Sequence, residues 1–213
     1  DAVVTDPPYG IDGGAPGGSR TRGKGNYVRN AGWNDTEQYI GDVVVPFVRL
    51  LIDSVPAVIV TPGKRCMFMY PNPDDIGCFW SPAAVGMGRW GFNVFHPILY
   101  YGKNPRAGTG NLPSGIAVTE PPANNLHPCA KPLRAWTWLV KKATLPGQTV
   151  LDPFMGSGTT GVCCAITGRN FVGFEIEEQY VSIARGEIER ALGNPVPDDD
   201  RPVQQILFSG PTE

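Results

Sequence analysis

The sequence predicts an α/β domain with a doubly wound, mostly parallel sheet. Short, continuous runs of apolar and β-branched residues are typical of strands buried on both faces, and helix-length segments separate these runs. In the last third of the chain the order is strand 149–152, helix 157–167, strand 170–175 and helix 177–192. This alternation indicates parallel strands joined by crossover helices.

Length and composition agree with one compact domain. A chain of 213 residues can bury roughly 70% of the surface that it exposes when unfolded. Glycine (27 residues) and proline (22 residues) are abundant, but the 41% share of hydrophobic residues argues against disorder. We therefore expect ordered apolar segments between long irregular stretches.

The N-terminal third predicts two buried strands with a helix between them. Residues 1–5 form the first strand, and the two prolines that follow end it, because proline cannot extend a central strand. Between residues 36 and 52 apolar side chains recur at helical spacing, and Pro46 should kink or divide that helix. Residues 57–61 form the second strand.

The middle of the chain gives weaker signals. Proline and glycine interrupt residues 62–91, where we predict no regular element. Residues 92–101 predict one or two strands interrupted near Pro97, and residues 102–126 predict an irregular insertion. Residues 132–144 predict an amphipathic helix with proline near its first turn.

Two stretches lack any periodicity. Residues 10–35 are rich in glycine and polar residues, and a loop of this length is usually functional or mobile. Residues 194–213 form a polar, proline-containing tail that we expect to be loosely held.

Charge and cysteine content exclude several classes of protein. The net charge of −2 provides no global attraction to nucleic acid, so any nucleic-acid surface must be local. Five cysteines without C-x-x-C spacing argue against a disulfide framework, and two histidines do not complete an obvious zinc site. With neither a signal peptide nor a membrane-spanning run, we expect a reduced, cytoplasmic protein without membrane contact.

The segment after strand 149–152 carries a glycine motif. Gly156, Gly158 and Gly161 spell G-x-G-x-x-G into a helix, and Glu175 closes the next strand 19 residues after the first glycine. Such a turn allows close approach of the backbone, and the carboxylate is placed for a ribose, which favours an adenosine-containing cofactor. The alternative is a tight strand-to-helix turn with no ligand.

NAD is a competing cofactor for this motif. Only 38 residues follow Glu175, too few for the remaining strands of a dinucleotide fold, so the N-terminal part must supply them and the strand order is permuted. An NAD-dependent oxidoreductase stays open only if the N-terminal tetrapeptide is incidental.

That tetrapeptide is Asp6-Pro7-Pro8-Tyr9, at the carboxyl end of the first strand. Asp6 and a proline carbonyl can accept the two hydrogens of an exocyclic amine, the prolines hold both acceptors rigid, and Tyr9 offers a surface for stacking a base. Two acceptors would push the nitrogen toward tetrahedral geometry and free its lone pair. The alternative is a proline turn that merely ends a strand.

Together these motifs resemble the amino-methylating DNA methyltransferases, in the group that places the catalytic motif before the cofactor motif. Two further segments carry the resemblance. His127-Pro-Cys-Ala-Lys131-Pro132 is similar to the family's His-Pro-x-x-Lys-Pro box, and residues 173–180 are similar to its acidic segment. The resemblance implies a Rossmann-like fold of the S-adenosylmethionine-dependent methyltransferases, with S-adenosylmethionine as cofactor and DNA as substrate.

By this resemblance Phe154 lines the adenosine, Gly156 and Gly158 admit the methionine portion, Glu175 holds the ribose and Lys131 approaches the cofactor carboxylate. The implied catalytic residues are Asp6, Pro7, Pro8 and Tyr9. The implied cofactor site comprises Lys131, Asp152, Pro153, Phe154, Gly156, Gly158, Thr159, Thr160 and Glu175.

The chain departs from the family pattern in two places. Cys129 and Ala130 replace the usual Thr-Gln or Thr-Glu, which removes a polar contact. The family's upstream Leu-x-Gly-Asp segment, which borders the cofactor adenine, is not part of this sequence, so we expect weak cofactor binding.

DNA contacts are expected in two regions. Four cations in loop 10–35, namely Arg20, Arg22, Lys24 and Arg29, could clamp phosphates or could belong to an ordinary solvated loop. The family order places target recognition at about residues 102–126, with Lys103 and Arg106 among the candidate contacts. Trp33 and Tyr27 could fill the gap left by a flipped base, and Trp33 could equally anchor the loop.

The resulting prediction is a methyltransferase catalytic domain over residues 1–193, with loop 10–35 at its active site, recognition insertion 102–126 and tail 194–213. Adenine N6 is the favoured acceptor because the motif begins with Asp, whereas cytosine N4 enzymes more often begin with Ser. The alternatives are a cytosine N4 methyltransferase and an inactive fragment that binds DNA or cofactor. A homodimer and a partner in a restriction–modification system both stay open.

Overall fold

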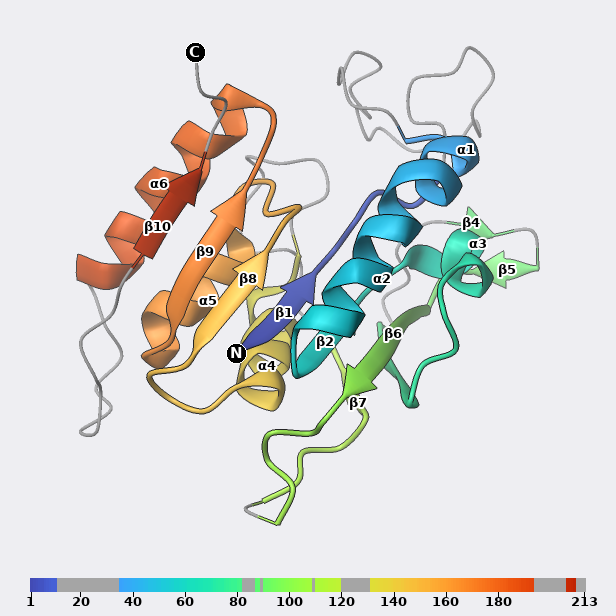
Figure 1. The fold of residues 1–213 in the computed structure, drawn as a ribbon, viewed down its shortest axis with the longest axis horizontal. Helices are drawn as coiled ribbons and strands as arrows, with labels where there is room; N and C mark the ends of the chain where they lie inside the picture. The colour runs from blue at the N-terminus through green and yellow to red at the C-terminus, as the bar shows by residue number, and fades with distance from the viewer. Residues whose placement is uncertain are drawn as a thin grey trace.

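The computed structural model of the chain describes residues 1–10, 35–81, 87–88, 90–108, 110–119, 131–193 and 206–209, with backbone only at 87–88 and 206–209. These segments form one main sheet with helices on both faces (Figure 1). This architecture confirms the predicted α/β class with a mostly parallel sheet.

Within the described residues the main sheet has eight strands in the order β10-β9-β8-β1-β2-β6-β3-β7. The strands from β10 to β2 pair in parallel, whereas β6 runs antiparallel to both β2 and β3. The strands are β1 (Ala2–Thr5), β2 (Ala57–Val60), β3 (Asp75–Trp80), β6 (Phe95–Gly102), β7 (Gly115–Ala117), β8 (Thr149–Asp152), β9 (Asn170–Phe174) and β10 (Ile206–Ser209).

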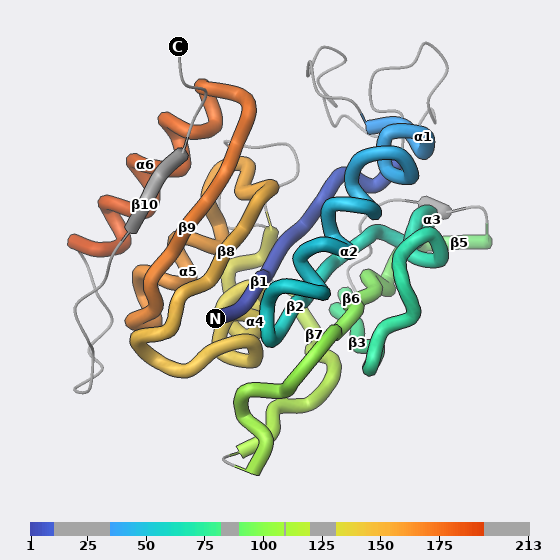
Figure 2. Tube along the Cα trace, in the orientation of Figure 1, coloured from blue at the N-terminus to red at the C-terminus, as the bar shows by residue number. Residues whose placement is uncertain are grey.

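Helices cover both faces of this sheet and enclose two cores. Val4 and Phe171 belong to the core under α4, α5 and α6, whereas Val3 and Val58 belong to the core under α2. Neighbouring strand residues point to opposite faces, which is why Val3 and Val4 separate. Figure 2 shows α2 crossing the front of β1 and β2. The helices are α1 (Glu37–Tyr39), a π-helical segment (Ile40–Val44), α2 (Val45–Ser54), α4 (Leu133–Ala143), α5 (Thr159–Thr167) and α6 (Glu178–Gly193).

The chain changes its winding direction between β1 and β8. It runs from β1 through α2 to β2 on one side, and from β8 through α5 to β9 on the other. β1 and β8 are neighbours, with Ala2 opposite Val150. Ligands of doubly wound sheets bind at such a point, outside the carboxyl ends of the strands. Asp6 and Asp152 both lie at that edge.

Two prolines lie inside regular elements without interrupting them. The helix predicted over 36–52 forms as one helical run from Glu37 to Ser54, and it is not divided at Pro46. The run passes through the π-helical segment Ile40–Val44 ahead of Pro46, which stands in the first turn of α2 and offers no backbone N–H to the preceding turn. Pro97 likewise does not interrupt β6. It precedes Leu99, the first residue of β6 that pairs with β2, so on that side the proline disturbs no ladder.

Three strands form where we predicted irregular structure, and there the prediction was wrong. β3 lies within residues 62–91, β7 within the insertion 102–126 and β10 within the tail 194–213. Each is short or only partly buried, and such strands depend on their pairing partner more than on their own composition. The region 62–91 also contains α3 (Gly63–Cys66), a 3-10 turn (Met67–Met69) and the strand β4 (Met87–Gly88), which pairs with β5 (Gly91–Phe92).

No helix among the described residues combines the length and the apolar character that crossing a membrane would require.

Candidate active site

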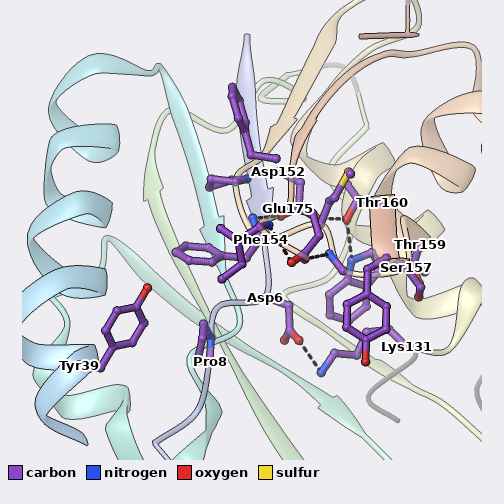
Figure 3. A pocket seen from close by; sticks show the side chains of 17 residues that line it. Asp6, Pro8, Tyr39, Lys131, Asp152, Phe154, Ser157, Thr159, Thr160 and Glu175 are labelled. Atoms are coloured by element: carbon purple, nitrogen blue, oxygen red, sulfur yellow. Dashed lines mark hydrogen bonds and ion pairs between the residues drawn. The ribbon is translucent and has the colours of Figure 1, made fainter. Parts of the chain in front are cut away.

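Two segments far apart in the sequence meet in one pocket. Asp6 follows β1, and the turn that begins at Asp152 follows the neighbouring strand β8. Both contribute to a cavity of about 210 Å³ (Figure 3). Its lining consists of Asp6, Pro8, Tyr39, Lys131, Trp136, Asp152, Pro153, Phe154, Met155, Gly156, Ser157, Thr159, Thr160, Phe174, Glu175, Ile176 and Tyr180. The structure therefore joins the two motifs that the sequence presents separately.

Three donors hold the carboxylate of Asp6. The hydroxyls of Tyr9 and Thr61 donate to Oδ1, the second over 2.5 Å. The Lys131 ammonium lies 2.6 Å from Oδ2, as the dashed line in Figure 3 marks. The two side chains of this ion pair are 18% and 19% exposed, so water screens their attraction only in part.

Tyr9 does not line the cavity. Its ring packs on Gly63, where an added Cβ would lie 2.7 Å from Tyr9 Cγ. Lys131 Nζ lies against the same residue, donating to the Tyr9 hydroxyl over 2.7 Å and lying 4.7 Å from the centroid of the Tyr9 ring. In this structure Lys131 thus takes both interactions that we assigned to a target base, the hydrogen bond to Asp6 and the contact with the Tyr9 ring.

Electrostatics keep Lys131 charged. Burial alone lowers the pKa of Lys131, but the Asp6 charge and the contacts with Tyr9 outweigh burial and raise the pKa well above its usual range. Burial, followed by the Asp6 charge, likewise raises the pKa of the Tyr9 phenol. At neutral pH Lys131 is therefore an ammonium without a lone pair, and Tyr9 is a neutral donor.

Asp152 sits in a different environment. Its side chain is 2% exposed and accepts hydrogen bonds from Thr5 at 2.7 Å, Thr160 at 2.5 Å and the backbone N–H of Phe154 at 3.1 Å. Burial raises the pKa of Asp152 to about 6, although the two hydroxyl bonds oppose the rise. Trp136 Nε1 donates to the Thr160 hydroxyl, which connects the network to α4.

Glu175 follows the next strand, β9, and its carboxylate binds the glycine turn. Its Oε2 accepts the backbone N–H of Gly156 at 3.0 Å, and its Oε1 accepts the N–H groups of Ile176 and Glu177. The carboxylate is thereby fixed at the rim of the cavity beside Phe154 (Figure 3).

The glycines of the motif have different surroundings. Gly156 lines the cavity with φ of +51°, a conformation that favours glycine. Gly158 is absent from the lining, and a Cβ there would lie 2.7 Å from Ala184 of α6. At Gly161 a Cβ would lie 2.3 Å from Ile188 Cδ1. Only the first glycine contacts the cavity, and the other two allow α5 to pack closely.

Of the predicted DNA-contact residues, the two that the structure describes do not lie at this cavity. Arg20, Arg22, Lys24 and Arg29 lie outside the described residues, as do Tyr27, Trp33 and His127 to Ala130. Lys103 and Arg106 lie at the opposite end of the sheet. Gly102 pairs with Ala57 at the amino end of β2, and a Lys103 N–H bond to Pro56 continues that ladder. Arg106 bonds the carbonyls of Gly110 and Lys141.

Several residues of the site escaped the sequence prediction. Thr5 and Thr61 hold the two aspartates, while Tyr39, Trp136 and Tyr180 line the cavity. Position was the available signal for the threonines, because each ends a predicted buried strand next to a motif at the same sheet edge. The three aromatic residues belong to helices, where nothing local separates a lining residue from a core residue.

A family comparison extends this geometry. A family model described as DNA methylase, of the N6 and N4 type, matches residues 71–186. The chain belongs to this DNA methylase family. The match spans the glycine turn and Glu175 and begins after Asp6–Tyr9.

Individual DNA methyltransferases are similar to part of the chain in sequence. The type II methyltransferase M2.DpnII of Streptococcus pneumoniae is 43% identical over 63 residues, which cover 30% of this chain and 24% of that protein. In sequence, the chain thus matches about a quarter of the length of this curated relative.

Two solved structures share the fold. The M1.HpyAVI–SAM complex has a TM-score of 0.58 and 20% identity, covering 88% of each chain. PvuII DNA methyltransferase, described as cytosine-N4-specific, has a TM-score of 0.60 and 14% identity, covering 90% of this chain and 85% of that one. At such identities the likeness establishes the Rossmann-like methyltransferase fold.

Among the described residues no cluster of three or more His, Cys, Asp or Glu side chains could hold a metal ion.

Proposed function

We propose that this chain transfers a methyl group from S-adenosylmethionine to an exocyclic amine of a base in DNA, with adenine N6 as the favoured acceptor. One observation carries the proposal: Asp6 lines the same cavity as Gly156 of the glycine turn and Glu175, which follows β9. The structural neighbours include a methyltransferase complex with SAM and a cytosine-N4-specific enzyme. The preference for adenine rests on the Asp that begins the tetrapeptide.

The cofactor half of the cavity fits such a donor. Glu175 offers a fixed carboxylate to a ribose, Phe154 and Ile176 offer apolar surface to an adenine, and Gly156 lets a ligand approach the backbone. When bound, S-adenosylmethionine supplies an electrophilic methyl group on a sulfonium centre. The target base supplies the nucleophilic amine, and the protein has to orient that amine and take up its proton.

Asp6 provides the acceptor for the target amine. The amine of a nucleobase is a poor nucleophile because its lone pair is delocalised into the ring, and a carboxylate that accepts one N–H hydrogen bond localises that pair. Once the nitrogen carries the methyl group it has one proton too many. The Asp6 carboxylate is the adjacent base that can take this proton.

Lys131 competes with the target amine for Asp6 Oδ2, because its ammonium lies 2.6 Å from that oxygen. While Lys131 stays there it cannot itself be methylated, since its raised pKa leaves it without a lone pair. Movement of Lys131 toward a carboxylate on the cofactor would vacate Oδ2 without leaving the cation unpaired.

DNA would approach over the edge that carries α3 and the β4–β5 hairpin. Lys64 and Arg65 belong to α3, which follows the carboxyl end of β2 after Thr61 and Pro62. Lys64 donates to Asn93 beside the hairpin, and Arg65 pairs with Glu37. Trp90 is fully exposed and Phe92 is 68% exposed. Cations that contact phosphates and aromatic rings that stack on bases are the means by which proteins hold a displaced strand.

Two interactions relate this edge to the Asp6 site. His96 lies near the start of β6, and burial together with the Lys131 charge lowers the pKa of His96. Tyr9 packs on Gly63, the first residue of α3. A base flipped from the duplex at this edge would have a short path to Asp6.

The experiment is methyl transfer from tritium-labelled S-adenosylmethionine to DNA, followed by nucleoside analysis. We expect label in N6-methyladenine. Label in N4-methylcytosine would select the cytosine alternative, and cofactor binding without any label would select the inactive fragment.

Asp6→Ala sharpens that experiment. It should lower kcat by at least about 100-fold, as loss of a group that acts in the transition state does, while the Kd for S-adenosylhomocysteine changes little. Asp42→Ala, at an exposed position of the π-helical segment, is the matched control and should leave both quantities unchanged. An Asp6→Ala enzyme that retains most of its turnover would remove Asp6 from the reaction.

A further inference from the structure

The carboxyl end of β2 places a threonine against the proposed catalytic carboxylate. Thr61 follows Val60, the last residue of β2, and is 3% exposed. Because β1 and β2 are parallel and Thr5 pairs with Val60, Thr61 lies beside Asp6 at the same sheet edge. The Thr61 hydroxyl donates to Asp6 Oδ1 over 2.5 Å.

The single hydroxyl hydrogen of Thr61 belongs to this bond. The other acceptor within reach, the Thr5 carbonyl oxygen, is 3.3 Å away and already accepts the Thr61 backbone N–H at 3.1 Å. A 2.5 Å bond from a hydroxyl to a carboxylate falls in the range of charge-assisted hydrogen bonds, which are about twice as strong as neutral ones.

The sheet itself fixes the position of Thr61. Its backbone N–H extends the β1–β2 ladder by one residue, and a β-branched side chain has few χ1 rotamers. Tyr9, the other donor to Oδ1, belongs to the turn that leaves the sheet. Of the two hydroxyls that donate to Asp6 Oδ1, that of Thr61 is therefore the one held in place by the end of a strand.

Thr5 does for Asp152 what Thr61 does for Asp6. Thr5 is 1% exposed, and its hydroxyl donates to Asp152 Oδ1 over 2.7 Å. The bond from the Thr61 N–H to the Thr5 carbonyl joins the two pairs. The positions of Asp6 and Asp152 are thus coupled through two threonines at the ends of adjacent strands.

We propose that Thr61 is a positioning residue for the transfer reaction, and this inference rests on the proposed function. Thr61 fixes Oδ1 of Asp6 so that Oδ2, the oxygen now facing Lys131, is presented to the target amine. Without the hydroxyl, Asp6 keeps Tyr9 and Lys131 as partners but can rotate away from the amine.

The test compares Thr61→Val, which keeps the side-chain shape without the hydroxyl, with Thr61→Ser, which keeps the hydroxyl. Thr61→Val should lower kcat about 10- to 100-fold, the effect of losing one hydrogen bond to a charged group, and should leave the Kd for S-adenosylhomocysteine unchanged. Thr61→Ser should stay close to the wild type in both quantities.

Two further variants separate positioning from a general loss of structure. Thr167→Val removes a hydroxyl that is equally buried but donates within α5, and it should leave kcat unchanged. Thr5→Val should show the opposite pattern from Thr61→Val: it should weaken S-adenosylhomocysteine binding and should lower kcat less than Thr61→Val does. Crystal structures give a readout that does not depend on turnover: the Asp6 carboxylate should move in Thr61→Val and stay in Thr61→Ser.

Each outcome has one meaning. An inactive wild type refutes the proposed function. An active wild type with Thr61→Val within twofold of it, or with equal losses in the valine and serine variants, overturns the inference alone. If Thr61→Val does not fold, Thr61→Ala against Thr61→Ser makes the same comparison and is judged by the same criteria.

Discussion

At the scale of single residues, two aspartates at neighbouring strand ends have different partners. Asp6 is partly exposed and pairs with a cation, whereas Asp152 is buried and accepts hydrogen bonds from two neutral hydroxyls and a backbone amide. Asp152 holds Thr5, Thr160 and the Phe154 amide together at the wall of the cavity. Asp152 stabilises this part of the structure by accepting hydrogen bonds, and a buried neutral side chain can also accept hydrogen bonds.

The raised pKa of Asp152 makes stability depend on pH. Its pKa rises from 3.8 in the unfolded chain to about 6 in the fold, so the folded state binds this proton more tightly. The resulting stabilisation is complete below about pH 4 and is lost as the pH rises through about 6.

Asp152→Asn, which cannot ionise, should remove that dependence. Relative to the variant, the wild type should lose on the order of 2–3 kcal/mol of unfolding free energy between pH 4 and pH 7. Urea denaturation across this range measures the difference. Parallel pH curves for the two proteins would show that Asp152 does not titrate as its burial requires.

Some residues of the site could be predicted from the sequence and others could not. Asp6, Phe154 and Glu175 stand in or beside recognisable motifs at strand ends, so their meeting followed from the parallel sheet. Thr61 carries no motif, and its role depends on the register between β1 and β2. The contact of Lys131 with Asp6 joins residues on distant segments, and no local pattern encodes it.

At the scale of elements, α5 is the tightly packed part of the cofactor half. Gly158 and Gly161 let it approach α6 and β9, because added Cβ atoms would overlap Ala184, Ile188 and Phe171. The helix begins directly at the turn that lines the cavity, so its packing also sets the position of Thr159 and Thr160.

Gly161→Ala should therefore destabilise the fold by about 1–3 kcal/mol through overpacking. The matched control is Gly186→Ala in α6, where a Cβ meets nothing within 4 Å. That substitution should stabilise by about 0.5–1 kcal/mol, because alanine is the better helix former. Denaturation midpoints measure both changes, and a shift of the same sign in the two variants would contradict the packing account.

Elements differ in how well composition predicts them. β1, β2, β8 and β9 are short apolar runs in a parallel sheet, which requires apolar side chains on both faces. β3 buries only alternate residues, and β7 has three residues, so their pairing with β6 and with each other decides their structure.

At the scale of the whole molecule, β10 forms one edge of the sheet. It pairs in parallel with β9, opposite Phe171 to Phe174, although it comes from a tail without a strand signal (Figure 1). An uncovered β9 would expose a row of unpaired backbone groups. The strand therefore protects the edge beside Glu175.

A chain ending at Gly193 should expose that edge. Amide hydrogens of β9 that face β10 should exchange at least about tenfold faster with solvent, since they lose their partners, whereas those of β1 should not change. Hydrogen-exchange mass spectrometry on the full and shortened chains measures both. Equal protection of β9 in the two chains would mean that β10 does not pair as described.

The whole molecule also explains why one cavity can serve two ligands. The switch in winding direction brings β1 and β8 together, and each strand delivers one motif to the same edge. A crystal structure of the protein with sinefungin, a stable analogue of S-adenosylmethionine, tests this directly. We predict its ribose at Glu175, its adenine beside Phe154 and its amine-bearing carbon directed toward Asp6. Sinefungin bound elsewhere, or with that carbon turned away from Asp6, would contradict the account.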